Sequence, residues 1–270
     1  MKKIIDKIVK SIKSKVDIEP EIGIVVSFGL SEIIDRIEDR VELPFKDIDG
    51  LVTLGKDATT CKFYFGTIAG KKVVVMYDRL HYYQGYKPSE VVLPIYALKE
   101  LGCKVLVNSS AVGAINKRIK VGDIVLFSDH LNFSNRNPLI GVDCEPYGVR
   151  FFDMTNAYNY DLLNQAYTVG KNLGIGLKKG VYIEFMGPNG ETPAEIHMAQ
   201  IMGADVVGFH VANEVVAARY CGMEVIGVSL VTNHASAFSR SKIRYEDIKY
   251  NRQVASGYFG EYLYSLIKSL

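Results

Sequence analysis

The chain has 270 residues, of which 48% are apolar and 23% are charged, and its net charge is +2. This composition is typical of a globular protein with a substantial core. The small net charge gives no reason to expect nucleic acid as a partner. No apolar run is long enough to form a transmembrane helix, so we expect no membrane partner.

The cysteines of the chain lie far apart in the sequence and form no Cys-x-x-Cys pair. Such spacing favours reduced thiols in a cytoplasmic protein over a disulfide framework or a zinc site. The cysteines concerned are Cys61, Cys103, Cys144 and Cys221.

The N-terminal segment Met1–Val16 is basic and carries isoleucine and valine residues at helical spacing. We predict an amphipathic helix within residues 1–17 that packs on its own domain. Because the polar face is rich in lysine, a helix lying on a membrane surface remains an alternative.

From residue 22 onward, short apolar runs typical of strands alternate with segments that have helical spacing and helix caps. The predicted strands cover residues 22–26, 62–68, 71–77, 104–108, 122–127, 182–185, 205–208 and 224–232, and the predicted helices cover 32–37, 88–101, 161–173, 194–202, 213–221 and 245–269. No linker or repeat divides the chain. We therefore predict a single α/β domain over residues 1–270, with a mixed, largely parallel central sheet flanked by helices.

Two stretches are predicted to lie outside these elements. Residues 109–116 are mostly small and predict a turn, whereas residues 129–153 are rich in Asn, Pro and Gly and predict a long loop. A loop of that length in a compact domain usually has a functional or interface role.

A predicted strand, turn and helix over residues 182–202 present one carboxylate, Glu191, on the turn. The helix start is marked by Thr192 as N-cap, by Pro193, and by Glu195 at capping-box spacing. Ligands in open α/β sheets usually bind at the ends of strands. The alternative is that Glu191 is an ordinary solvated loop acid.

Other polar groups also follow predicted strands, and we expect them to share one pocket with Glu191. Arg79 offers a planar cationic fork suited to phosphate, and His81 offers a second donor. The backbone at Ala111–Ala114 is a candidate anion nest. Alternatively, Arg79 is a surface charge and the small residues serve tight packing.

Glu191 and Asn233 together suit a different ligand group. A carboxylate accepts hydrogen bonds and a carboxamide both donates and accepts, so the pair would select a heterocycle with an N–H beside a carbonyl. Asn233 as a simple turn residue is the alternative. His130, His197 and His234 have no metal-binding spacing and are interpreted as structural or surface residues.

Taken in order, these segments resemble the trimeric purine nucleoside phosphorylase family, of the nucleoside phosphorylase fold. One of them is Arg79-Leu80-His81-Tyr82-Tyr83-Gln84-Gly85-Tyr86. The full set comprises residues 22–30, 79–86, 111–116, 121–124, 137–139, 150–154, 187–188 with 191–192, 203–205 and 229–233. Each stretch alone is weak evidence for the resemblance. Together they occur in the order of the family and cover the chain from residue 22 almost to its end.

The resemblance implies reversible phosphorolysis of 6-oxopurine ribonucleosides or deoxyribonucleosides by a homotrimer, with phosphate as co-substrate and no metal or organic cofactor. It implies catalytic roles for Asn233, Glu191 and His81. It further implies that Arg79, His81 and Ala111 bind phosphate, that Tyr83 and Phe209 contact ribose, that Glu191 and Asn233 hold the purine beside Tyr182, and that Phe151 reaches the ribose site of a neighbouring subunit.

The sequence departs from the family pattern mainly around the phosphate. Phe28 and His210 stand where the family usually has phosphate-binding serines, and Tyr245 stands where a histidine usually meets the ribose 5′-hydroxyl. Gly190 replaces an aromatic residue before the glutamate. A lost hydrogen bond to a charged ligand costs about 1.5–3 kcal/mol; Ser27 or a protonated His210 are candidates to recover part of it.

These departures leave three interpretations open. The first is an active phosphorylase with a rebuilt phosphate pocket, which the retained Arg79 and His81 favour. The second is a nucleoside hydrolase or an enzyme with another substrate. The third is a non-catalytic nucleoside binder. Phe28 favours the second and third interpretations.

Overall fold

The computed structural model describes residues 1–27, 29–55, 60–141, 147–235 and 244–270. Phe28 and Cys144, which the sequence analysis singled out, therefore lie outside the described residues. Among those described, Cys103 and Cys221 are buried thiols.

The central feature of the fold is one mixed sheet, which has nine strands within the described residues. The strands are β1 (Ile22–Val26), β2 (Glu38–Pro44), β3 (Lys62–Ile68), β4 (Lys71–Tyr77), β5 (Val105–Ala114), β6 (Ile124–Asn132), β7 (Lys178–Glu184), β8 (Val206–Gly208) and β9 (Glu224–His234).

The strand order is β2-β3-β4-β1-β5-β8-β7-β6-β9, and β9 also pairs with β5. The second half of the sheet therefore closes on itself as a small barrel, while β1 to β4 extend from β5 as an open sheet. The pairs β1–β4, β1–β5, β5–β9, β6–β7 and β7–β8 are parallel, and the other pairs are antiparallel. The predicted α/β class with a mixed sheet is confirmed.

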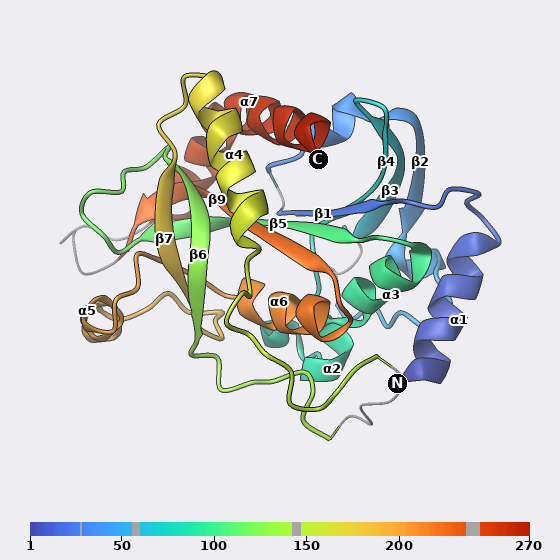
Figure 1. The fold of residues 1–270 in the computed structure, drawn as a ribbon. Coiled ribbons are helices and arrows are strands. Elements are labelled where there is room, and N and C mark those ends of the chain that lie inside the picture. The colour runs from blue at the N-terminus through green and yellow to red at the C-terminus, as the bar shows by residue number, and fades with distance from the viewer. Residues whose placement is uncertain (28, 56–59, 142–146, 236–243) are drawn as a thin grey trace.

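Helices cover both sides of this sheet (Figure 1). α4 (Tyr160–Asn172) and α7 (Tyr245–Ser269) lie above it in that view, whereas α2 (Pro88–Val91), α3 (Leu93–Leu101) and α6 (Val211–Tyr220) lie below. α5 (Pro193–Ile201) stands beside the ends of β7 and β6. Because both faces are covered, central strands such as β1 are buried at every residue and appear in the sequence as continuous apolar runs.

Several predicted boundaries were wrong. The turn expected at residues 109–116 is largely strand, because β5 continues to Ala114 and pairs there with both β8 and β9. The long loop begins only after β6 ends at Asn132, and the helix expected over residues 88–101 is divided at Val92 into α2 and α3. The short helix near residue 32 is the 3₁₀ turn η1 (Glu32–Arg36), and strand β2 was not predicted.

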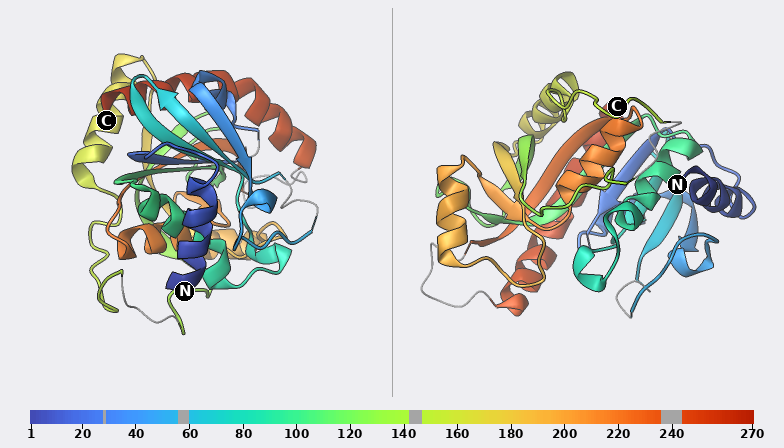
Figure 2. Two further views of the ribbon diagram at one scale, coloured as in Figure 1. Left: turned by 90° about the vertical axis from the view of Figure 1, so that its right-hand side faces the viewer. Right: turned by 90° about the horizontal axis from the view of Figure 1, so that it is seen from below.

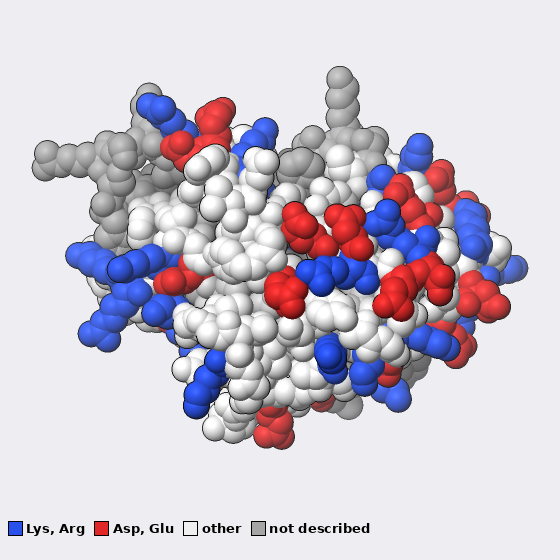
Figure 3. Space-filling view, turned by 90° about the horizontal axis from the view of Figure 1, so that it is seen from above, with Lys and Arg blue, Asp and Glu red and all other residues white. Residues whose placement is uncertain are grey.

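The described helices include none that is both long enough and apolar enough to cross a lipid bilayer. On the face formed by α4 and α7, acidic and basic side chains are interspersed around a broad neutral area (Figure 3). This mixture matches the small net charge of the chain.

Helix α1 (Lys2–Lys13) lies at the periphery beside α3 (Figure 2). Its apolar face is turned inward, since Ile5 and Ile8 have no exposed surface and Ile12 is 1% exposed, whereas Ile4 is 47% exposed. The amphipathic pattern of the sequence is therefore used for packing within the chain.

We expect Ile8→Ala to lower the free energy of unfolding by about 2–5 kcal/mol, because it leaves a cavity between α1 and the core. Ile4→Ala on the outer face is the matched control and should change it by less than about 1 kcal/mol. Urea unfolding of both variants measures the difference. Equal losses would show that α1 is not held by its inner face.

Candidate active site

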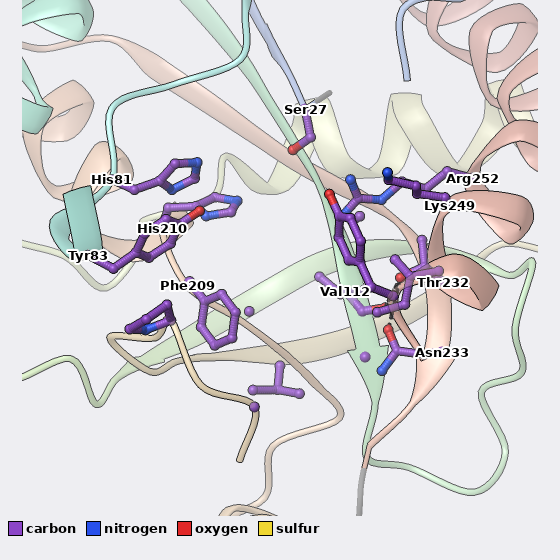
Figure 4. A pocket seen from close by; sticks show the side chains of 18 of the residues that line it. Ser27, His81, Tyr83, Val112, Phe209, His210, Thr232, Asn233, Lys249 and Arg252 are labelled. Atoms are coloured by element: carbon purple, nitrogen blue, oxygen red, sulfur yellow. Dashed lines mark hydrogen bonds between the residues drawn. The ribbon is translucent and has the colours of Figure 1, made fainter. Parts of the chain in front are cut away.

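A cavity of about 780 Å³ opens where strands of the two halves of the sheet end. Segments distant in the sequence meet there: the end of β1, the loop after β4, the middle of β5, the turn before α5, the β8–α6 junction, the end of β9 and the start of α7 (Figure 4). Residues singled out from the sequence that line it include His81, Tyr83, Ala111, Glu191, Phe209, His210, Asn233 and Tyr245.

The wall around Ala111 exists because β5 changes partners. Among the described strands, β5 pairs with β1 as far as Asn108 and with β8 only from Gly113. Along the intervening stretch one edge of β5 therefore faces the cavity, and Ala111, Val112 and Gly113 line it. The small residues expected to form a turn instead provide an open strand edge.

Asn233 is held at this wall by a register shift between β5 and β9. Gly113 pairs with Asn233, whereas Val112 pairs with Val231, so Thr232 is the extra residue. The Thr232 hydroxyl lies 2.9 Å from Asn233 Oδ1 and donates to it. A methyl group on Gly113 would lie 3.1 Å from Asn233 Nδ2, so the glycine makes room for the amide. Asn233 Nδ2 donates one hydrogen to the His234 carbonyl at 3.2 Å and keeps its second as a donor.

Glu191 lies on the other side of the cavity, on the turn before α5. The predicted capping box is present: Thr192 caps the Glu195 N–H, and the Glu195 carboxylate accepts from Thr192 N at 2.7 Å. This cap fixes the turn that carries Glu191. Burial raises the pKa of the Glu191 carboxyl, which its own backbone N–H partly offsets.

Aromatic and imidazole rings form a third side of the cavity. His81 stacks on Tyr83 with ring centroids 4.6 Å apart, and His210 meets His81 edge-on at 4.9 Å. Phe209 adjoins them (Figure 4). Burial and the nearby Arg79 charge lower the pKa of His81 to about 3 and hold that of His210 well below its usual value. Both rings are therefore neutral in the empty site at neutral pH.

Arg79, which the resemblance predicts to bind phosphate, is not among the residues that line the cavity. Its side chain is 1% exposed, and its Nε lies 3.2 Å from Glu214 Oε1. Nη2 donates to the Ser109 carbonyl at 2.7 Å and to Asn108 Oδ1 at 3.4 Å. Nη1 reaches Ser27 Oγ at 3.5 Å. The guanidinium thus lies behind the wall, neutralised by a buried carboxylate.

Tyr182 also lies behind the wall, so the expectation that it lines the base pocket is corrected. It is fully buried, and its hydroxyl accepts from His210 N at 3.2 Å and from Val211 N at 3.5 Å, the first amides of α6. A methyl group on Gly208 would lie 2.8 Å from this hydroxyl, so only glycine permits the approach. Tyr182 therefore holds the backbone at His210 in place.

The buried carboxylate of Glu184 completes this cap. It accepts from Ala212 N at 2.6 Å and from Asn213 Nδ2. Together with Tyr182 it satisfies the amides at the start of α6 from inside the protein. Burial, offset in part by these two hydrogen bonds, raises the pKa of Glu184 to about 7.

Phe151 lies away from this cavity and is 91% exposed. A second cavity of about 440 Å³, lined by Phe133, Phe185 and Met186 among others, adjoins the first at Glu191. Phe151 lines neither of these two cavities within its own subunit.

The sequence analysis singled out Tyr245 but missed the other residues that helix α7 contributes. Ile248, Lys249 and Arg252 also line the cavity, at the spacing of one helical face. It also missed Asp78 and the buried Glu184 and Glu214. The helical spacing was available as a signal, but it does not show which face of α7 meets the sheet. Among the described residues, no three His, Cys, Asp or Glu side chains gather to hold a metal ion.

Comparison with known proteins agrees with this architecture. A family model described as the phosphorylase superfamily matches residues 21–268, which assigns the class of protein. Purine nucleoside phosphorylase 1 of Geobacillus stearothermophilus is 33% identical over 98% of this chain and 97% of its own length.

Two solved structures are also similar. A Schistosoma purine nucleoside phosphorylase in complex with hypoxanthine has a TM-score of 0.94 and 36% identity over 99% of this chain and 97% of that one. The Schistosoma mansoni enzyme in complex with inosine has a TM-score of 0.94 and 35% identity over 99% and 96% of the two chains. The chain belongs to the purine nucleoside phosphorylase family.

Glu184 gives the stability of the protein a specific pH dependence. The folded state keeps the Glu184 proton up to about pH 7, while an unfolded chain releases it near the ordinary glutamate value. Between these values a rise in pH therefore destabilises the folded state, by about 3 kcal/mol in all. Glu184→Gln removes this pH-dependent destabilisation. The free energy of unfolding of the variant, relative to that of the parent, should therefore rise by about 3 kcal/mol as the pH increases from about 4.5 to 7.5.

Urea unfolding of both proteins across this pH range measures the difference, and parallel curves would contradict the assignment. Glu42→Gln is the control. The hydrogen bond from Lys62 lowers the pKa of the Glu42 carboxyl. Glu42→Gln should therefore change the pH dependence of the unfolding free energy in the opposite direction, and only weakly because the pair is exposed.

Proposed function

We propose that the chain catalyses reversible phosphorolysis of 6-oxopurine ribonucleosides or deoxyribonucleosides, giving the free base and ribose 1-phosphate or its deoxy analogue. Phosphate is the co-substrate, and the proposed reaction requires no metal or organic cofactor. The observation that carries the proposal is the single cavity that joins Glu191 and Asn233 to His81 and His210. The similar Schistosoma proteins hold hypoxanthine and inosine, a base and a nucleoside of this class.

The base would bind between Glu191 and Asn233. The Glu191 carboxylate accepts from a ring N–H. Asn233 Nδ2 has one hydrogen left to donate to the base, because it donates the other to the His234 carbonyl. As the bond between C1′ and the base breaks, its electron pair moves to the base. The Asn233 donor stabilises the negative charge that develops there.

The sugar would lie between the base and the phosphate, against Tyr83 and Phe209. Positive charge develops on the sugar ring as the base departs, and an adjacent phosphate anion stabilises that charge and supplies the attacking oxygen. Holding phosphate against C1′ contributes the proximity term of catalysis. On this proposal, His81, His210 and the open β5 edge at Ala111 contact the phosphate, and Tyr245 contacts the sugar.

One observation favours nucleoside hydrolysis as the second candidate function. Arg79 is neutralised by Glu214, and both cavity histidines are neutral, so these groups form a weak anion site. Water would then replace phosphate as the attacking group. The two reactions differ in their product, ribose 1-phosphate or free ribose.

The test is release of base from inosine and guanosine with and without phosphate. We expect release to require phosphate and to give ribose 1-phosphate. Asn233→Ala should lower kcat by about 10²–10³-fold because it removes a donor to the departing base. Release without phosphate would establish the hydrolase, and no release with nucleoside bound would establish a binder.

His234→Ala is the matched control for the Asn233 variant. His234 is the next residue on β9, and its side chain is exposed outside the cavity. It should turn over inosine like the parent. If Asn233→Ala also behaves like the parent, the base site is assigned wrongly.

We further propose that the protein is a cytoplasmic homotrimer. The buried thiols of Cys103 and Cys221 are consistent with a reducing compartment. The exposed apolar residues Ile140, Val149 and Phe151 suit a subunit interface. The second cavity, beside Glu191, is lined by apolar rings that would receive Phe151 of a neighbouring copy.

Phe151→Ala should raise the KM for inosine by about tenfold or more, because an aromatic anchor at an interface contributes at least this much. Steady-state kinetics and sedimentation velocity should be measured together. Tyr250→Ala, which removes another exposed aromatic side chain, is the control and should match the parent. A monomeric parent with unchanged kinetics in Phe151→Ala would contradict the proposal.

A further inference from the structure

The sequence suggested Arg79 as the cation of the anion-binding part of the cavity, but its side chain is buried behind the wall and is not among the residues that line it. Arg79 is paired with Glu214 and hydrogen-bonded to Ser109 and Asn108. The Phe28 side chain has no hydrogen-bond donor. A cation that lines the cavity would therefore strengthen the binding of a phosphate dianion there.

Helix α7 supplies cationic side chains at the same place. Lys249 and Arg252 line the cavity one helical turn apart, on the face that also carries Tyr245. Figure 4 shows both side chains entering from α7, across the cavity from His81 and His210 and below Ser27. Lys249 is exposed and its ammonium lies 4.7 Å from the Tyr245 ring centroid, whereas Arg252 is partly buried.

Arg252 adjoins the turn that follows β1. A methyl group built on Gly29 would lie 3.5 Å from Arg252 Cδ. The charge of Arg252 is also felt across the cavity, since it helps to lower the pKa of His210. Arg252 thus lines the same cavity as Ser27, Asp78 and the two histidines.

We propose that Arg252 is the principal phosphate-binding cation of this protein, assisted by Lys249, and that α7 has taken over the role of the missing serine donors. A guanidinium presents two parallel N–H groups to phosphate oxygens, which a serine hydroxyl cannot do. Arg79 and Glu214 hold the cavity wall from behind. This inference rests on the proposed function, because it names the group that binds its co-substrate.

The test compares the parent with Arg252→Met and Arg252→Lys at saturating inosine and varied phosphate. Arg252→Met should raise the KM for phosphate about 10–100-fold, the loss expected for hydrogen bonds to a charged ligand. The KM for inosine should change less than about threefold. Arg252→Lys keeps the positive charge but not the two parallel N–H groups, so its KM for phosphate should lie between those of the parent and Arg252→Met.

Lys268→Met is the matched control. It removes one positive charge from the same helix at an exposed position 16 residues further on, about 24 Å away along the helix axis. It should leave both KM values unchanged, which excludes an effect of net charge. Thermal melting of every variant shows whether the fold is retained.

Calorimetric titration with inorganic phosphate separates failure of this inference from failure of the proposed function. If the parent binds phosphate, Arg252→Met does not, and neither turns over nucleoside, the proposed function fails and the inference stands. If the parent is an active phosphorylase and Arg252→Met keeps its phosphate KM and affinity, the inference is wrong. It is also wrong if Arg252→Met impairs only release of base from a nucleoside 5′-phosphate, because the oxyanion would then belong to the substrate.

Discussion

The buried ion pair between Arg79 and Glu214 is the interaction on which the cavity depends. Asn108 closes the pair into a ring, since its Oδ1 accepts from Arg79 and its Nδ2 donates to Glu214 Oε2 at 2.9 Å. The ring ties the end of β4 to β5 and α6, and through Ser27 to β1. Removing one member would leave an uncompensated buried charge, at a cost of about 3–5 kcal/mol. These elements are therefore fixed before any ligand binds.

This network has a consequence for chemistry. The Arg79 guanidinium directs Nε to a carboxylate and Nη2 to a carbonyl and a side-chain amide oxygen, which fixes it in place behind the cavity wall. The same burial that holds it in place keeps His81 and His210 neutral. A dianion entering the cavity would favour protonation of these rings, because an opposite charge stabilises the imidazolium. On the proposed function, phosphate binding and proton uptake would therefore be coupled in this site.

The sequence predicted the class of fold and most of the elements, because buried strands and capped helices leave local patterns. It predicted Glu191 for the same reason, since the capping box at Thr192 marks its turn. It could not predict that β5 continues to Ala114, because the partner strands β8 and β9 are supplied by residues about a hundred positions away. Nor could the sequence show that Arg79 is buried rather than exposed in the cavity. The carboxylate that pairs with it, Glu214, lies on α6, far away in the sequence.

The face of helix α7 that lines the cavity could not be predicted from the sequence. Four of its residues have the spacing of one helical face: Tyr245, Ile248, Lys249 and Arg252. A face of such mixed polarity is equally consistent with exposure to solvent. Only the docking of α7 on β9, seen in three dimensions, turns this face toward the cavity. On the proposed function, the donors missing from the strand-end turn would be supplied by this helix, which packs across the turn. The site would then keep its chemistry although the usual sequence motif is absent.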